Sequence, residues 1–392
     1  MSEADSPEDF NPFKGMPIFG DLGQLFSQQA ASTWETARQV ATAVAAEGQS
    51  EPNVDPVDRL ALEELGRVAE LQVANSTGLS TTRRGQAAAV TAVTRSQWAV
   101  ATIGAYQELL EPIGSLSSRA EAEDAFSDSV QAMFGQLMKM IGPAMLSMTA
   151  GSMVGNLARR SLGQYDLPIP RDGSQLMVVP ANIDALAAEW SLDRSDLRLW
   201  VCLSELTHHA VLSIPHVRAR LDELLGDYVR GFEASPAALE SRLGELDLAD
   251  PDSLSSLQSV LGDPEIILGA IQSPAQRRLL PQLTALVAVI AGYVDWTMDS
   301  IGHGLISSYQ RLSEALRRRR VTANASDRFI EKMLGLELGQ EHYDRGSAFA
   351  RGVVERAGAA GLARLWHSAR ELPTPAEVDA PGLWLARIDL PH

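Results

Sequence analysis

Apolar residues recur at helical spacing through most of this chain, and that periodicity limits its fold more than any other feature. Alanine, leucine, arginine, glutamate and glutamine are abundant, whereas alternation of β-branched and polar residues is nearly absent. The sequence therefore predicts a mainly α-helical fold with many helices. In Gly163–Val179, prolines and a glycine lead into a short apolar run, so we expect at most a small β-sheet near residues 165–180.

Helix boundaries can be predicted from capping residues and helix breakers. The periodicity predicts helices at Gln86–Leu110, Asn182–Glu189, Ser195–Ser213 and Leu283–Met298, among others. Asn182 is the expected N-cap of the second of these, and Asp193 or Ser195 of the third. A polar interval that ends near Pro281 is expected to precede the fourth.

The length and composition allow a large buried core. The chain has 392 residues, of which 45% are hydrophobic. Residues 1–10 are acidic and polar, and we predict a disordered tail there. Residues 11–392 are expected to form one domain, with a helical N-terminal half over about 11–160 and a second half over about 161–392.

The charge balance limits the partners of the protein. A formal net charge of -17 repels phosphate backbones and anionic lipid surfaces, so we expect no nucleic-acid partner. The most apolar run, Leu283–Ile290, is far shorter than the roughly 20 residues that cross a bilayer as a helix. We therefore predict no membrane span.

Two further features predict a cytoplasmic protein. The acidic N-terminus lacks the basic and apolar parts of an export signal. The single cysteine, Cys202, excludes an internal disulfide framework and a cysteine-rich zinc cluster. A reducing compartment fits this composition best.

The segment Leu197–Arg220 contains the most informative motif. Ser204, Glu205 and His208 match the zinc-binding pattern HExxH with serine in place of the first histidine. In HExxH, residues four apart on one helix face bring two imidazoles to one zinc ion, and the glutamate acts on the bound water. Serine at the first position removes one of the two imidazoles.

Other side chains offer alternative chemistry. His209 points about 100° away from His208 around the helix, so we expect a partly buried polar role for it. Cys202, Glu205 and His209 share a helix face, which permits a thiol or soft-metal site, although a free cysteine is more often a small buried hydrophobe. His216 and His303 could supply an imidazole from outside the helix.

The sequence also contains four consecutive arginines, Arg317–Arg320. In an acidic chain, such a run is better explained by the solvated C-terminus of a helix, which the helix dipole favours, than by phosphate binding.

Five blocks along nearly the whole chain have distinctive sequences, which read NPFKGMPIFGDLG, GSMVGNLARRSLGQYDLPIP, DLRLWVCLSELTHHAVLSIPHVRARL, LGLELGQEHYDRGSAF and LARLWHSARELPTPAEV. These blocks resemble an actinobacterial family of zincin-like presumed hydrolases. Members are often described as zinc-dependent metalloproteases, and a sister clade is associated with biosynthesis of the deazaflavin coenzyme. The resemblance implies a zincin-like, mainly helical fold, with the metalloprotease-like core in about 161–392.

The resemblance also implies roles for individual residues. Glu205 corresponds to the general base and His208 to the second zinc ligand, whereas Ser204 stands where the family has histidine. The family's third ligand is a glutamate in an E-G-Y-x-D-like block, where this chain has Ala291. Asp295, in the same block, is a candidate to orient His208 from outside the metal site.

Two functions remain open on these grounds. A catalytic zinc needs three protein ligands plus water, and only one of the three remains, so the first hypothesis is a family member without zinc or catalysis that binds an unknown protein or peptide. The second is a hydrolase that uses Glu205 and His208, either without metal or with metal recruited through His209, His216 or His303.

Overall fold

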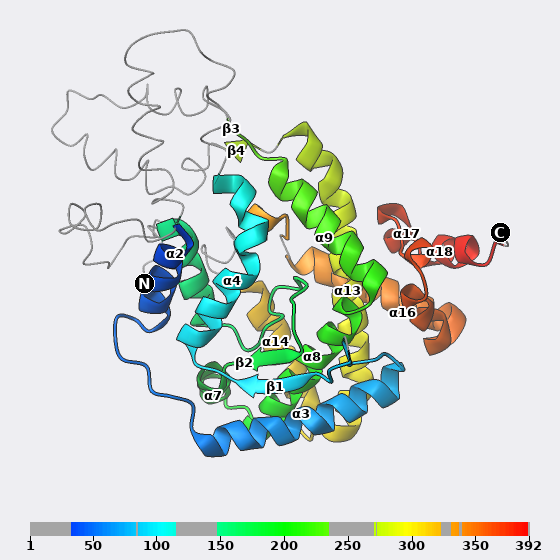
Figure 1. Cartoon of the computed structure of the whole chain (residues 1–392). Coiled ribbons are helices and arrows are strands. Elements are labelled where there is room, and N and C mark those ends of the chain that lie inside the picture. The colour runs from blue at the N-terminus through cyan, green and yellow to red at the C-terminus, as the bar shows by residue number, and fades with distance from the viewer. Residues whose placement is uncertain are drawn as a thin grey trace, which may run out of the picture.

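The computed structural model describes residues 33–83, 85–114, 147–234, 270–271, 273–322, 331–336 and 339–390. All structural statements below concern these residues, and the tail predicted over residues 1–10 lies outside them. The fold is mainly α-helical, as the periodicity predicts. Figure 1 shows long helices surrounding a small sheet.

The described elements run from Thr33 to Ile388. In chain order they are α2 (Thr33–Ala45), α3 (Pro56–Thr77), β1 (Ala89–Ala92), α4 (Arg95–Gly114), a helix over 147–158, β2 (Gln175–Val178), α7 (Pro180–Glu189), α8 (Arg194–Leu212), α9 (Pro215–Arg230), β3 (Glu233–Ala234), β4 (Ala270–Ile271), α13 (Pro274–Leu305), α14 (Tyr309–Val321), α16 (Gln340–Ala363), the 3-10 turns η2 (Arg364–Trp366) and η3 (Ala369–Glu371), α17 (Pro375–Asp379) and α18 (Pro381–Ile388).

The small parallel sheet corrects one predicted helix. β2 lies within the predicted strand segment, but its partner is β1, which falls inside the predicted helix Gln86–Leu110. The helix begins only at Arg95. The run around β1 is short, apolar and rich in alanine, so periodicity alone cannot separate strand from helix there. Pairing with β2 and packing against α3 select the strand.

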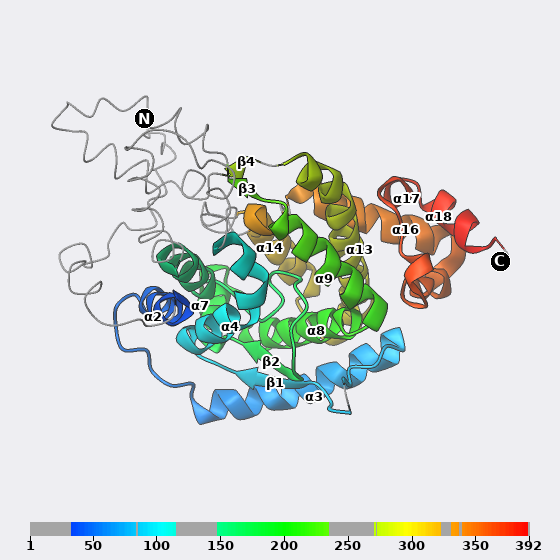
Figure 2. The same cartoon turned by 45° about the horizontal axis from the view of Figure 1, so that its top comes forward.

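Helix α13 is the central element of the core. It packs against α16, α9, α8 and α3, and Figure 2 shows it between α9 and α16. A Cβ atom added to Gly292 would lie 2.2 Å from the backbone of Gly346 in α16, and one added to Gly346 would lie 1.9 Å from the carbonyl oxygen of Ala288. The two backbones therefore touch, which fixes α13 relative to α16.

Helix α13 begins earlier than predicted. A capping box between Ser273 and Gln276 starts it at Pro274, and Pro281 lies inside it. The capping box pairs backbone amides at the first turn with side-chain acceptors, so the end of the predicted polar interval is already helical. By length and composition, α13 is the one candidate membrane-spanning helix in the described part of the chain, but 67% of its most apolar window is buried, as in a core helix.

Of the two predicted helix N-caps near the motif, one is confirmed and the other is wrong. Asp193 caps α8 as predicted, its side chain accepting a hydrogen bond from the Asp196 amide. Asn182, predicted to cap α7, lies inside that helix instead, because Pro180 already occupies its first position. The Asn182 amide donates to the carbonyl oxygens of Ala158 and Ser161. It thereby ties α7 to the segment that leads into the site.

Candidate functional site

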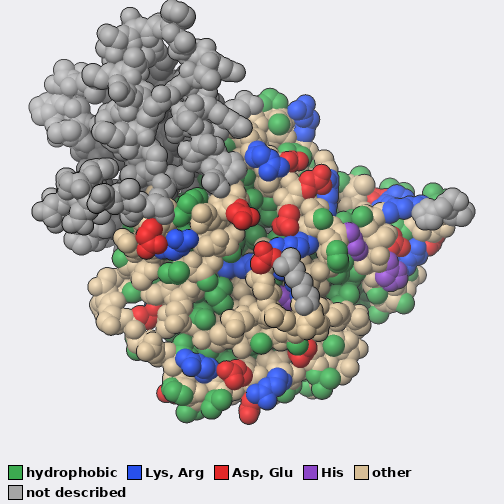
Figure 3. All heavy atoms as spheres, in the orientation of Figure 1, with side chains coloured by type: hydrophobic (Ala, Val, Ile, Leu, Met, Phe, Trp, Pro, Cys, Tyr) green, Lys and Arg blue, Asp and Glu red, His purple; other side chains and the backbone are tan. Residues whose placement is uncertain are grey.

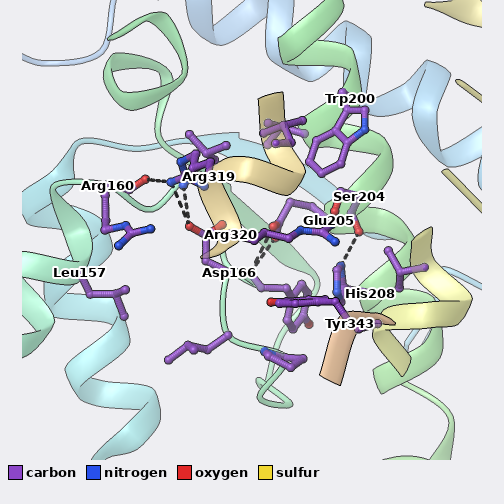
Figure 4. Close-up of a pocket in the computed structure, with 18 of the residues that line it drawn as sticks. Leu157, Arg160, Asp166, Trp200, Ser204, Glu205, His208, Arg319, Arg320 and Tyr343 are labelled. Atoms are coloured by element: carbon purple, nitrogen blue, oxygen red, sulfur yellow. Dashed lines mark hydrogen bonds and ion pairs between the residues drawn. The ribbon is translucent and has the colours of Figure 1, made fainter. Parts of the chain in front are cut away.

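The four motif positions line one pocket. Ser204, Glu205 and His208 face it from α8, and Ala291 faces it from α13. The cavity has a volume of about 110 Å³, and Figure 4 shows side chains from α8, α14 and the segment after residue 157 around it. Residues nearly ninety positions apart in the sequence therefore meet here, as the resemblance implies.

Glu205 is buried, and the backbone holds its carboxylate. The amides of Gln164 and Tyr165 donate to its Oε2 at 2.8 and 3.0 Å. A Cβ atom at Gly163 would lie 2.3 Å from the Glu205 carboxyl carbon, so this close approach requires glycine. These three residues lie in GQYDLPIP, one of the blocks that carry the family resemblance. No sequence motif predicts a role for them at this site.

Burial changes the protonation of Glu205. Loss of solvent, together with the nearby charge of Asp166, raises the pKa of Glu205 to about 8, despite the two backbone amides. Glu205 is therefore mostly a neutral carboxylic acid at pH 7. A neutral acid donates a proton and cannot act as a general base without first losing one.

His208 lies beside Glu205 with a defined tautomer. Its Nδ1 is 2.9 Å from the carbonyl oxygen of Ser204, which can only accept, so Nδ1 carries the hydrogen and Nε2 keeps its lone pair. The ring stacks on Tyr165, with 6.0 Å between the ring centroids. Burial lowers the pKa of His208 to about 4, so the imidazole is neutral at physiological pH.

Asp295 has a different partner from the expected one. Both of its carboxylate oxygens accept from Nη1 of Arg320, at 2.8 and 2.9 Å. Burial disfavours the charged form of Arg320, but Asp295, Tyr343 and Asp166 together outweigh it and hold the pKa of Arg320 above its ordinary value. The guanidinium also lies 5.0 Å from the centre of the Tyr343 ring.

Two arginines of the run Arg317–Arg320 are exposed and two are largely buried. The prediction of a solvated helix C-terminus is therefore correct for only half of the run. The side chains of Arg317 and Arg318 are 53% and 67% exposed, as expected at a helix end. Those of Arg319 and Arg320 are only 18% and 20% exposed and line the pocket. Figure 4 shows Arg320 reaching toward Ser204 and His208. The helical phase of α14 separates the two pairs, and only the neighbouring elements show which pair is inside.

The opposite side of the pocket is also charged. Arg319 lies 3.7 Å from Asp166 and donates to the carbonyl oxygen of Arg160. Arg160 lines the pocket as well, and burial with the nearby charge of Arg319 lowers its pKa. The pocket thus gathers three arginines in a chain whose net charge is strongly negative.

The donor set does not fit a zinc ion. The pocket lining contains one imidazole, that of His208, with a hydroxyl at Ser204 and a methyl group at Ala291. Three protein ligands are the rule for catalytic zinc. Within the described residues, no group of three histidine, cysteine, aspartate or glutamate side chains could hold a metal. The guanidinium of Arg320 disfavours a further positive charge at His208, whereas Asp295 and Asp166 favour one, so the missing ligands, and not the local charge, argue against zinc.

The other sequence candidates do not line the pocket. His209 is fully buried, with Nδ1 3.2 Å from the Tyr165 hydroxyl. The His303 ring lies 4.7 Å from that of Tyr309, in a tilted arrangement near the end of α13, and His216 lies in the first turn of α9. Cys202 is fully buried, and burial raises the pKa of its thiol to about 12, which keeps it unreactive.

The raised pKa of Glu205 predicts a pH dependence of stability. The folded state keeps the Glu205 proton up to about pH 8, whereas the unfolded chain loses it near pH 4.5, so the free energy of unfolding falls as the pH rises between these values. The pKa values of His208 and His209 are lowered from 6.5 to about 4 in the folded state. These two residues therefore change the free energy of unfolding mainly below about pH 6.5, where the histidines of the unfolded chain take up protons. From pH 6.5 to 8 we expect a loss of about 2 kcal/mol.

Urea unfolding at successive pH values measures this loss. Glu205→Gln keeps the side-chain shape without a titrating proton. Its free energy of unfolding should therefore fall by about 2 kcal/mol less than that of the parent between pH 6.5 and 8. Equal slopes for the two proteins between pH 6.5 and 8 would show that Glu205 is ionised throughout.

Comparison with known proteins gives two matches. The zincin-like metallopeptidase family matches residues 33–385. A solved structure, described as a presumed hydrolase with a novel fold from Chloroflexus aurantiacus, superposes with a TM-score of 0.65 at 23% identity, covering 92% of this chain and 99% of that one. At this identity the likeness concerns the fold. No curated protein matches the sequence.

Proposed function

The chain belongs to the zincin-like metallopeptidase family, and from that premise we propose that it is a member that binds a protein or peptide in the family's pocket without zinc and without hydrolysis. The family and the helical fold support the pocket as the place of binding. The chemistry of its lining supports the loss of the metal. Cys202, buried and unpaired in disulfides, agrees with the proposed cytoplasmic location.

One observation carries this proposal: the positions around His208 do not supply a set of zinc ligands. Ser204 offers a hydroxyl and Ala291 a methyl group, and among the described residues no three histidine, cysteine, aspartate or glutamate side chains are placed to hold a metal. Arg320 lies close to His208 but is paired with Asp295, so the two charges largely cancel. The missing ligands therefore favour a metal-free pocket.

Without a bound metal, the state of Glu205 also disfavours a role as general base. Its carboxylate accepts from the amides of Gln164 and Tyr165, so it holds that segment in place. Its raised pKa leaves little of the basic form at neutral pH. We infer that Glu205 holds the pocket wall in place, whereas a catalytic glutamate at this position would activate water.

The remaining lining suits a peptide. Trp200, Leu316 and Val294 are apolar, and Arg160 and Arg319 can donate to carbonyl or carboxylate oxygens. A peptide segment combines apolar side chains with such acceptors.

Metal content is the direct test. Protein purified without a histidine tag or chelator should contain far less than one zinc per chain by elemental analysis, and a casein-derived peptide mixture should remain uncut by it. Stoichiometric zinc would overturn the proposal. Peptide cleavage that disappears in Glu205→Ala would instead support the hydrolase alternative, whereas cleavage that survives this substitution would come from a contaminant.

Binding is tested separately with the same peptide mixture. Peptides retained by the immobilised parent should be lost with Ala291→Leu, because the added side chain enters the cavity. Val100→Leu, at a partly exposed position on α4, is the control and should retain them. Equal retention by both variants would place binding outside the pocket.

A further inference from the structure

The outer face of α3 carries exposed hydrophobic residues in a row. Val57, Leu60, Val68 and Leu71 are 72%, 61%, 46% and 60% exposed. Within the described residues, these are half of the large hydrophobic side chains that are exposed. Figure 3 shows hydrophobic and charged side chains together along the lower edge, where α3 lies in Figure 1.

These four residues form one stripe opposite the buried face. At roughly 100° per residue, Val57, Leu60, Val68 and Leu71 fall within roughly 80° of one another around the helix. The residues that α3 buries lie on the other side; they are Leu62, Gly66, Ala69 and Val73. The helix is thus apolar on two opposite faces, and the inner one already packs on α8 and β1. A row of exposed apolar side chains on one face of a helix is a candidate interaction surface.

Two charged residues interrupt the stripe in a self-complementary order. Glu64 and Arg67 are both exposed on this side of α3, and neither forms an ion pair with another described residue. A twofold axis between residues 65 and 66 would place Glu64 of one chain opposite Arg67 of the other, and the reverse. The same axis places Leu60 opposite Leu71. One register therefore satisfies the Leu60–Leu71 contacts and both charges, while Val57 lies opposite Ala74 and Val68 opposite Glu63.

From this arrangement, we propose that a second copy of this chain docks on the α3 stripe as an antiparallel, twofold-symmetric helix pair. The contact comprises two Leu60–Leu71 contacts flanking two Glu64–Arg67 ion pairs. Because a single helix pair buries little area, the association is weak and concentration-dependent. This inference does not depend on the proposed function of the pocket.

Analytical ultracentrifugation over a concentration series tests the contact. The parent should shift from 42.3 kDa toward twice that mass as concentration rises. Leu60→Glu should weaken dimerisation by about tenfold or more, because it buries a charge in the contact. Leu383→Glu is the matched control, since Leu383 is also 61% exposed but lies on α18, and it should leave dimerisation unchanged.

Charge exchange tests the register. Glu64→Arg alone and Arg67→Glu alone each set like charges against one another and should weaken self-association by about tenfold or more. The Glu64→Arg, Arg67→Glu double variant should recover it, and an equimolar mixture of the two single variants should form mixed dimers. A monomer at all concentrations, or a dimer that these changes leave intact, would overturn the proposal.

Discussion

A Ser204→His, Ala291→Glu double variant is expected to purify with one zinc ion per chain, where the parent carries far less. Both positions line the pocket that holds His208, so the two substitutions complete a set of two imidazoles and one carboxylate. Full ligand sets in small zinc domains contribute roughly 10–16 kcal/mol of apparent binding free energy, which is far more than a single imidazole supplies. The change in zinc affinity should therefore span several orders of magnitude.

The matched controls separate ligand number from general perturbation. Either single variant supplies only two protein ligands and should bind zinc weakly. A Ser204→Ala, Ala291→Gln variant changes the same positions without adding a strong ligand and should bind none. Elemental analysis and titration with a zinc indicator measure the affinities. A folded double variant that takes up no zinc would show that Ala291 is not at the position of the third ligand.

The second large effect concerns Arg320. Replacing it with methionine should lower the free energy of unfolding by about 3 kcal/mol, because Asp295 is only 17% exposed and would lose both of its hydrogen bonds to the guanidinium. An Asp295→Leu, Arg320→Met double variant should recover much of this loss, since neither charge is then left without its partner.

Another arginine of the same helix provides the control. Arg318 is 67% exposed and pairs with Glu314 at the surface, so Arg318→Met should change the free energy of unfolding by less than about 0.5 kcal/mol. Urea unfolding of the four proteins at pH 7 measures the differences. Similar stabilities of the Arg318 and Arg320 variants would contradict the structural role given to the Arg320–Asp295 pair.

The two large predictions bear on one question, namely what provides the charge in this pocket. In the parent, a guanidinium held by Asp295 lies close to His208, and the neutral Glu205 lines the same pocket. If the restored ligand set recruits zinc, the new cation should also favour the ionised form of Glu205. The pH profile proposed for Glu205 would then flatten in the double variant when zinc is bound.

Local sequence patterns were sufficient for much of the fold. Apolar residues at helical spacing depend only on neighbours within a few turns, which is why the long helices and the mainly α-helical class could be predicted. Asp193 caps α8 through an amide three residues away, so it is also a local feature. The short strand β1 was missed because its conformation depends on pairing with β2, more than eighty residues later.

The candidate site also has a part that local sequence predicts and a part that depends on long-range contacts. The spacing of Ser204, Glu205 and His208 places them together on one helix, and the resemblance added Ala291 from α13. No local pattern predicts that Asp295 pairs with Arg320, because that contact joins two helices and competes with every other donor that Asp295 could reach.

The sequence by itself determined the helical class and the motif helix with serine at the first position of its HExxH-like pattern, since both follow from residue type and short spacing. The assignment of Ala291 to a ligand position rests on the family resemblance. Only the tertiary structure decided the protonation of Glu205, the partner of Asp295 and the direction of Arg320. Burial and long-range packing set local dielectric and charge, and neither can be computed from residues that are adjacent in the chain.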